Sequence, residues 1–191
     1  MVQTLQSDVG GGRDTHSPPR TCERISGRLP AYGGRMALEV GDERTLAAEL
    51  FNRVWDLLER TDRSPADDDT MLHMAHATRH HWGQVGEPVN LARGEWQCSR
   101  VYSVRGRAEP ATHHAQRCLD LCIEHGIGDF DLAYAYEALA RAALTGGDQA
   151  AAALLEQARG AAARIAEADD RALVEADLQA LTAKRPMPAA D

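Results

Sequence analysis

The densest group of side chains able to bind a metal lies in the segment HMAHATRHHW, residues 73–82. His73, His76 and His80 are spaced at i, i+3 and i+7, which places them along one stripe of a helix. His76 and His80 have the i, i+4 spacing at which two imidazoles can bind one ion, and no HExxH motif accompanies them. The pattern predicts a metal site on this helix, with a divalent transition metal such as zinc as its candidate cofactor.

A second stripe of candidate ligands follows later in the chain. His114, Cys118 and Cys122 are spaced at i, i+4 and i+8, again on one face of a helix. If this helix faces the one that carries His76, then His114 joins the metal site and Glu95, on the helix between them, completes it. The alternative is structural, since histidine and cysteine side chains also pack between helices without a metal, and Cys118 and Cys122 resemble small apolar core residues.

Other side chains in the same part of the chain suit the recognition of an anion. Arg79, Arg100 and Tyr134 are predicted to line a binding surface, because a planar guanidinium group pairs with a carboxylate or phosphate through two hydrogen bonds. Trp96 is the aromatic candidate for this surface. The alternative is that the charged residues form solvated helix faces and that the tryptophan anchors helix packing.

The composition restricts the class of function. The chain has 191 residues and a formal net charge of -8, which argues against nucleic acid and membrane surfaces as partners, because both need a concentrated basic surface. No apolar run could span a bilayer, and no secretory signal is visible, so we expect a cytoplasmic protein with reduced cysteines. Motifs of familiar enzyme classes are absent, and the sequence assigns no reaction.

All these residues are predicted to lie on helices. Aromatic residues make up only 5% of the chain and alanine is abundant, which favours an all-α fold packed through small side chains. Residues 1–35 are rich in Gly, Pro, Ser and Arg, and we expect them to form a disordered N-terminal tail. Helical periodicity between glycine and proline turns then predicts one domain over residues 36–185, built of about seven antiparallel helices.

Two segments of the predicted domain are alike. Residues 91–126 can be aligned with residues 132–165 at an offset of about forty residues. This alignment places Trp96 on Tyr136 and Gly106 on Gly146. Each segment has a helix with aromatic or small residues, a glycine turn and a second helix with small residues. We expect Gly106 and Gly146 to adopt a left-handed backbone conformation at these turns.

This repeat resembles the tetratricopeptide repeat (TPR) family, over about residues 70–168. The resemblance implies a right-handed stack of helix pairs with a concave groove that binds peptides or partner proteins. A plain antiparallel helix bundle is the alternative fold.

Two functional hypotheses follow. The first is a cytoplasmic TPR-like module that binds a protein, a peptide or a small anionic ligand in its groove. The second is a metal-binding protein or metal-dependent enzyme that uses His73, His76, His80 and His114. Both place the functional surface within residues 73–131, which hold most of the histidine, tryptophan and cysteine, and not on the alanine-rich residues 149–182.

Overall fold

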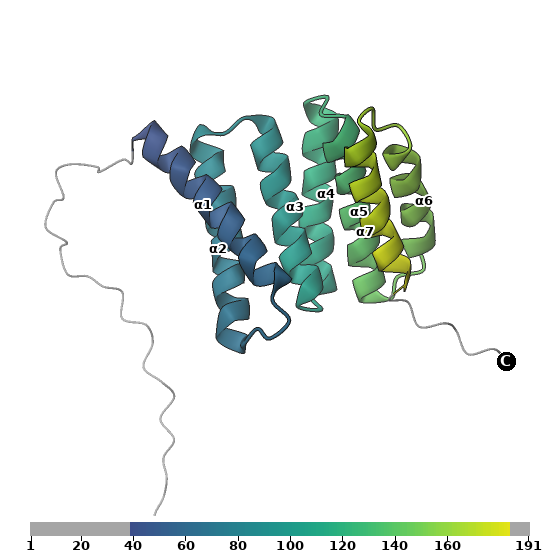
Figure 1. Ribbon diagram of the computed structural model, residues 1–191, viewed down its shortest axis with the longest axis horizontal. Coiled ribbons are helices and arrows are strands. Elements are labelled where there is room, and N and C mark those ends of the chain that lie inside the picture. Colours follow the sequence, from purple (N-terminus) through teal and green to yellow (C-terminus); the bar gives the residue numbers. More distant parts are fainter. Residues whose placement is uncertain (1–38, 184–191) are drawn as a thin grey trace, which may run out of the picture. The chain divides into compact units, whose positions relative to one another are not determined.

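The computed structural model describes residues 39–183, and these residues form seven α-helices and no β-strand (Figure 1). The helices are α1 (Val40–Glu59), α2 (Pro65–Val85), α3 (Pro88–Val104), α4 (Ala108–Glu124), α5 (Asp129–Gly146), α6 (Ala151–Ala162) and α7 (Ala168–Ala183). The prediction of an all-α protein with about seven helices is confirmed. The tail expected over residues 1–35 and the expected domain ends at residues 36 and 185 lie outside the described residues. No helix within the described range has the length and apolar composition needed to cross a bilayer.

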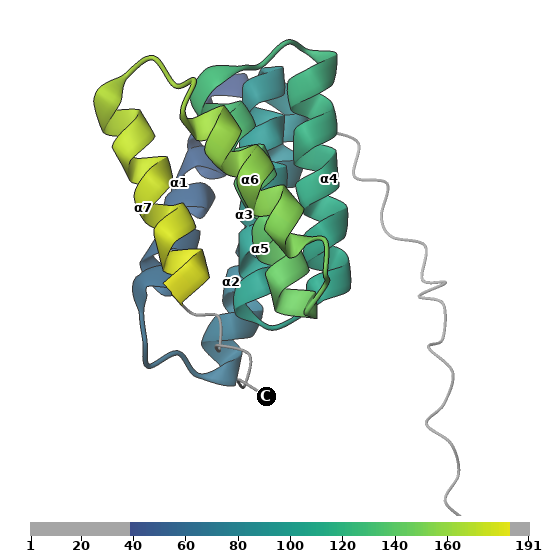
Figure 2. The same ribbon diagram turned by 90° about the vertical axis from the view of Figure 1, so that its right-hand side faces the viewer.

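Each helix packs against the one that follows it in the chain, from α1 on α2 to α6 on α7. In addition, α5 contacts both α3 and α7, and α1 contacts α3. α1 and α7 make no contact with each other, but both lie on the same side of the layer that contains α3 and α5 (Figures 1 and 2). Sequential packing of this kind is compatible with a helical-repeat fold.

Small side chains bring the central helices close together. The middle cluster of the core contains Trp96, Leu119 and Leu139, contributed by α3, α4 and α5. Ala115 and Ala138 lie between them and are 0% and 2% exposed. Because a methyl group takes little room, the helices approach closely at these positions and the larger side chains fill the remaining space. The alanines therefore allow α3 to pack closely against α4 and α5.

The starts of α2 and α3 are set by local sequence. At α2, Ser64 Oγ accepts a hydrogen bond from the Asp67 backbone N–H at 3.2 Å, and the Asp67 carboxylate accepts one from the Ser64 N–H at 2.9 Å. Pro65 occupies the first turn, where a missing N–H costs nothing. At α3, Pro88 occupies the same place. These short-range signals define where the two helices that carry His76 and Cys98 begin.

Glycines end several of the helices. Gly106 follows α3 with a φ of 69°, as expected from the sequence. The expectation for Gly146 was wrong, because this residue is the last of α5 and the left-handed position is the next residue, Gly147, with a φ of 67°. The helix continues one residue further because Gly146 still fits the α conformation, and its neighbour closes the turn.

Replacing Gly106 by valine should lower the free energy of unfolding by about 1–2 kcal/mol, because a β-branched residue is strained at positive φ. No atom lies within 4 Å of a Cβ built at Gly106, so the cost is one of backbone conformation alone. Urea unfolding would measure it. Gly41→Val is the matched control, since Gly41 also has no neighbour within 4 Å but does not have a positive φ. Equal, small effects at both positions would contradict the prediction.

Candidate functional site

Helix α3 presents reactive and polar side chains on two of its faces. Glu95, Cys98 and Tyr102 are spaced at i, i+3 and i+7, and they contact residues of α2 and α4. Trp96 and Arg100 are spaced at i, i+4 and line a cavity with residues of α1, α5 and α7. Because these spacings follow two different stripes of one helix, α3 contributes to two separate groups.

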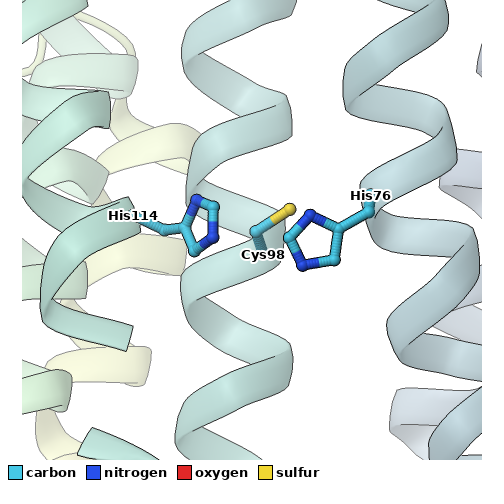
Figure 3. Close-up of side chains that lie close together, drawn as sticks. All are labelled: His76, Cys98 and His114. Atoms are coloured by element: carbon cyan, nitrogen blue, oxygen red, sulfur yellow. The ribbon is translucent and has the colours of Figure 1, made fainter. Parts of the chain in front are cut away.

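The first group, which we call the imidazole-thiol group, consists of His76 on α2, Cys98 on α3 and His114 on α4. Each offers one ligand atom, and these atoms all lie within 4.8 Å of one another. Figure 3 shows both imidazole rings directed from their helices toward the Cys98 side chain between them. His76 is exposed, His114 is partly buried and Cys98 is fully buried. This arrangement could hold a metal ion.

A buried carboxylate organises the surroundings of this group. Glu95 is 4% exposed; its Oε1 accepts hydrogen bonds from Arg79 Nε at 2.9 Å and Arg117 Nε at 3.5 Å, and its Oε2 lies 2.7 Å from His114 Nδ1. Burial favours a higher pKa for Glu95, but the hydrogen bond with His114 and the charge of Arg79 outweigh it, so the pKa is lowered. A Cβ atom at Gly94 would lie 2.8 Å from Arg79 Cδ, so any other residue here would force the arginine side chain to shift.

Tyr102 holds the two imidazole rings. Its hydroxyl lies 2.9 Å from His76 Nε2, and its ring stacks on that of His114 with centroids 5.6 Å apart and an interplanar angle of 9°. The His76 side chain is exposed, but partial desolvation of its ring lowers the pKa of His76, and the charge of His114 lowers it further. His76 is therefore held as a neutral imidazole at neutral pH, which is the form that binds metals.

Cys98 lies in an apolar setting. Burial, assisted by the negative charge of Glu95, raises the pKa of the Cys98 thiol to about 12. The thiol donates a weak hydrogen bond to the Ala75 carbonyl oxygen, with Sγ 3.5 Å away. Without a metal the side chain is thus a protonated thiol at neutral pH, and binding of a metal would release its proton.

The second group is a cavity of about 430 Å³ on the opposite face of α3, which we call the aromatic cavity. Its walls are a continuous series of ring contacts. Trp55 lies 5.5 Å from Trp96 between ring centroids, Trp96 lies 5.3 Å from Tyr134, and Tyr134 lies 4.8 Å from Phe130. The last two contacts are edge-to-face, the geometry that aromatic quadrupoles favour. α1 supplies one wall and α7 another.

One guanidinium group in this cavity lacks hydrogen bonds. The Nε and Nη1 atoms of Arg100 are buried and form no hydrogen bond with any residue that the structure describes, and Nη1 lies 3.9 Å from Glu137 Oε1. Glu137 is fully buried, pairs with Arg141 and accepts a hydrogen bond from Trp96 Nε1 at 3.4 Å. Burial lowers the pKa of Arg100, and the charge of Arg141 adds to this effect. Arginine nevertheless stays charged at neutral pH, so the cavity is bordered by a cation that has a counter-charge at 3.9 Å but no hydrogen bond.

The other charged residues of the cavity are satisfied. Arg93 donates two hydrogen bonds to the Asp131 carboxylate at 2.7 and 2.9 Å. Tyr134 donates one from its hydroxyl to Asp177 Oδ2 at 3.1 Å, and burial together with the negative charge of Asp177 raises the pKa of Tyr134. Two guanidinium groups and two carboxylates thus line the cavity, and their formal charges cancel.

The structure brings together three of the four residues predicted to bind a ligand. Arg100, Tyr134 and Trp96 all line the aromatic cavity. Arg79 lies on the other side of α3, where it pairs with Glu95. The sequence shows which arginines lie on helices, but the side of α3 that each reaches depends on how α2 packs against it.

Of the four predicted metal ligands, the structure brings His76 and His114 together. His73 and His80 are exposed on α2 and lie outside the group of ligand atoms. His80 instead packs against the neighbouring His81, with ring centroids 5.5 Å apart. Only one position of the histidine stripe, His76, lies with the ligand atoms that α3 and α4 contribute.

The sequence did not predict Cys98 as a member of the site or the burial of Glu137. The alternative that Cys118 and Cys122 are small core residues is confirmed. Cys118 lines the aromatic cavity and Cys122 is buried in the core, so neither joins His114. The spacing of Cys98 three residues after Glu95 was the available signal for Cys98. For Glu137, a charged residue inside the apolar run AYAYEALARAA was a signal of a buried ion pair.

Comparisons with protein-family models, with curated proteins and with solved structures found no match to this chain. The TPR resemblance therefore rests on the sequence pattern and on the order in which the helices pack.

Proposed function

We propose that this protein is a binding module for an organic anion that combines one carboxylate with an apolar body, held in the aromatic cavity. The observation that carries this proposal is the Arg100 guanidinium, which borders an aromatic cavity of about 430 Å³ and has no hydrogen-bond partner among the described residues. A concave, mostly apolar space with few polar groups is the usual form of a small-molecule site, and this volume lies within the usual range.

A carboxylate would satisfy Arg100. Leaving a charged donor without partners in a partly desolvated place is costly, and charge-assisted hydrogen bonds are the strongest that a side chain can form. Glu137 does not meet this need, because it is bonded to Arg141 and Trp96 and lies 3.9 Å from Arg100. The Arg100 guanidinium is therefore the anchor that we assign to the ligand's anionic group.

The walls indicate the rest of the ligand. Trp55, Trp96, Phe130 and Tyr134 offer ring faces and edges to an apolar or aromatic body. Asp131 and Asp177 also line the space, so a doubly charged group such as a phosphate monoester would meet repulsion. A single carboxylate fits this balance of charge better than a phosphate. Such a carboxylate occurs in small metabolite acids and at the C-terminus of a peptide or partner protein.

The imidazole-thiol group favours a second candidate function, the binding of a divalent transition metal such as zinc. Three ligand atoms of types that zinc prefers lie within 4.8 Å of one another. We also propose that the helices form a right-handed TPR-like stack and that the protein acts in the cytoplasm. The free thiols of Cys98, Cys118 and Cys122 support a reducing compartment.

The carboxylate proposal is tested by titrating the full chain with 3-phenylpropionate and with a short peptide that ends in phenylalanine. Tryptophan fluorescence reports on binding because Trp55 and Trp96 line the cavity. We expect at least one of the two acids to bind. Its neutral amide should bind at least about tenfold more weakly, since a hydrogen bond to a charged group contributes about 1.5–3 kcal/mol. The acid that binds more tightly shows whether the carboxylate belongs to a small molecule or to the C-terminus of a peptide.

Arg100→Met should remove this binding while the protein stays folded, because it removes a cation that forms no hydrogen bond and leaves Glu137 paired with Arg141. Arg53→Met is the matched control, since Arg53 is exposed on α1 and does not line the cavity. Equal affinity for acids and amides, or unchanged affinity in Arg100→Met, would refute the proposed function.

A further inference from the structure

We infer that the imidazole-thiol group is a zinc site with three protein ligands, Nδ1 of His76, Sγ of Cys98 and Nε2 of His114, and a fourth position open to water. This inference rests on the second function proposed above, the binding of a transition metal, and names its ligand atoms and its metal. It is independent of carboxylate binding, since the group lies on the opposite face of α3 from the aromatic cavity. It rests on the convergence of three side chains from three helices, seen in Figure 3 and measured by ligand atoms within 4.8 Å of one another.

The hydrogen bonds around His114 leave the nitrogen that a metal needs. Its Nδ1 is engaged by Glu95 Oε2 at 2.7 Å, which leaves Nε2 as the free donor atom. A carboxylate behind a metal-binding histidine is the common arrangement of zinc sites, because it sets the tautomer and raises the basicity of the opposite nitrogen. Glu95 is itself held by Arg79, so it is a rigid positioning residue and not a ligand.

His76 is oriented in the complementary way. Its Nε2 is engaged by the Tyr102 hydroxyl at 2.9 Å, which leaves Nδ1 for the metal. The Tyr102 ring stacks on His114, so one side chain positions both imidazoles. The ring centroids of His76 and His114 are 5.3 Å apart, and a small rotation of the exposed His76 side chain would close the group on an ion. The two histidines therefore present nitrogens that other hydrogen bonds do not occupy.

Cys98 decides the class of metal. Sulfur with two imidazoles suits zinc, whereas magnesium and calcium take oxygen ligands. The thiolate also supplies negative charge close to the ion, which matters because Arg79 and Arg117 already pair with the one carboxylate nearby. When zinc binds, the S–H bond of Cys98 breaks, the sulfur forms a bond to zinc, and the proton leaves to solvent. With His76 exposed, the fourth position can take a water molecule, as in open zinc sites.

The test uses the full chain, first freed of metal with a chelator and then titrated with zinc or with cobalt(II) as a spectroscopic substitute. We expect one ion per chain, a thiolate-to-cobalt charge-transfer band and the visible absorption of a four-coordinate cobalt. Cys98→Ser should abolish the charge-transfer band. Cys22→Ser is the control for the loss of a cysteine elsewhere in the chain, and it should leave the band unchanged; Cys22 lies outside the described residues.

Histidine variants separate this site from a general affinity of histidines for metal. Glu95→Gln should weaken zinc binding by about 10–100-fold, as loss of a supporting carboxylate does, and His76→Ala should weaken it more. His80→Ala on α2 and His113→Ala beside His114 should bind zinc like the wild type. His76 is exposed, so its variant should retain the helical circular-dichroism signal and the melting temperature of the wild type.

The inference is overturned if the wild-type chain binds no zinc or cobalt(II) in stoichiometric amount. It is also overturned if the charge-transfer band survives in Cys98→Ser, or if His80→Ala weakens binding as much as His76→Ala. Binding of copper(I) without zinc or cobalt(II) would refute the assignment to zinc. None of these outcomes affects the aromatic cavity, which is tested separately through Arg100.

Discussion

Replacing Glu137 by methionine should lower the free energy of unfolding by about 3–5 kcal/mol, the usual cost of removing one partner of a buried ion pair. The Glu137 side chain is fully buried, and Arg141 and Arg100 converge on its Oε1. Both guanidinium groups are mostly buried, with 14% and 21% of their side-chain area exposed. Methionine has a similar volume, so the loss does not arise from a cavity. It arises from the Arg141 cation left without its bonded partner, from loss of the longer ion pair with Arg100 and from an unbonded Trp96 N–H.

Urea unfolding followed by circular dichroism measures this effect. The double variant Glu137→Met/Arg141→Met should recover part of the loss, because it removes one of the stranded charges together with its partner. Glu156→Met is the matched control, since Glu156 pairs with Arg159 on the surface of α6 and is 72% exposed. The control should change stability by about 0.5 kcal/mol or less. A loss at Glu137 no larger than that at Glu156 would show that the buried pair does not stabilise the fold.

Replacing Glu95 by alanine should lower the free energy of unfolding by about 3 kcal/mol, at the low end of the range for buried ion pairs. The Glu95 side chain is 6% exposed and pairs with Arg79, His114 and Arg117. The cost is smaller than at Glu137 because half of the Arg117 side chain is exposed and can be solvated once its partner is lost. Glu49→Ala, at an exposed position of α1, is the control and should have little effect.

The effect of Glu95 should depend on pH with a definite sign. Its folded pKa is lowered below the ordinary value of 4.5, so its ionised form stabilises the folded protein. This contribution is complete above pH 4.5 and is lost as the pH falls through the lowered folded pKa. The difference in unfolding free energy between wild type and Glu95→Ala should therefore shrink in acid. A difference that stays constant from neutral to acidic pH would contradict the ion-pair explanation and point to packing alone.

Much of the fold could be predicted because helices depend on local sequence. The capping residues Ser64 and Asp67, with Pro65 between them, define the start of α2 through hydrogen bonds that span three residues. Gly106 ends α3 because few other residues adopt its φ of 69°. The error at Gly146 was one residue along a Gly-Gly pair, where either glycine meets the requirement of the turn. Local rules therefore predict that a turn exists more reliably than which residue forms it.

The candidate site was predicted only in part, because it joins residues far apart in the chain. Arg100 and Trp96 share one face of α3, which their spacing predicts, but their meeting with Phe130 and Asp177 depends on how α5 and α7 pack. A pattern along one helix contains no information about the rotation of the next helix around its axis. The sequence therefore predicted three of the residues that line the cavity, but it did not predict the shape or the charge balance of the cavity.

Local sequence is enough to predict the all-α class, the positions of most helix ends and the part of the chain in which reactive side chains concentrate, since each depends on contacts within a few residues. Which of these side chains meet depends instead on how the helices pack against one another. Cys98 lies between His76 and His114 because of how α2, α3 and α4 are rotated about their axes and shifted along them when they pack. Gly94 makes the approach of α2 possible, since any larger residue would meet Arg79 at 2.8 Å. Helical periodicity specifies the face on which a residue lies, and packing of small side chains between helices specifies what that face contacts.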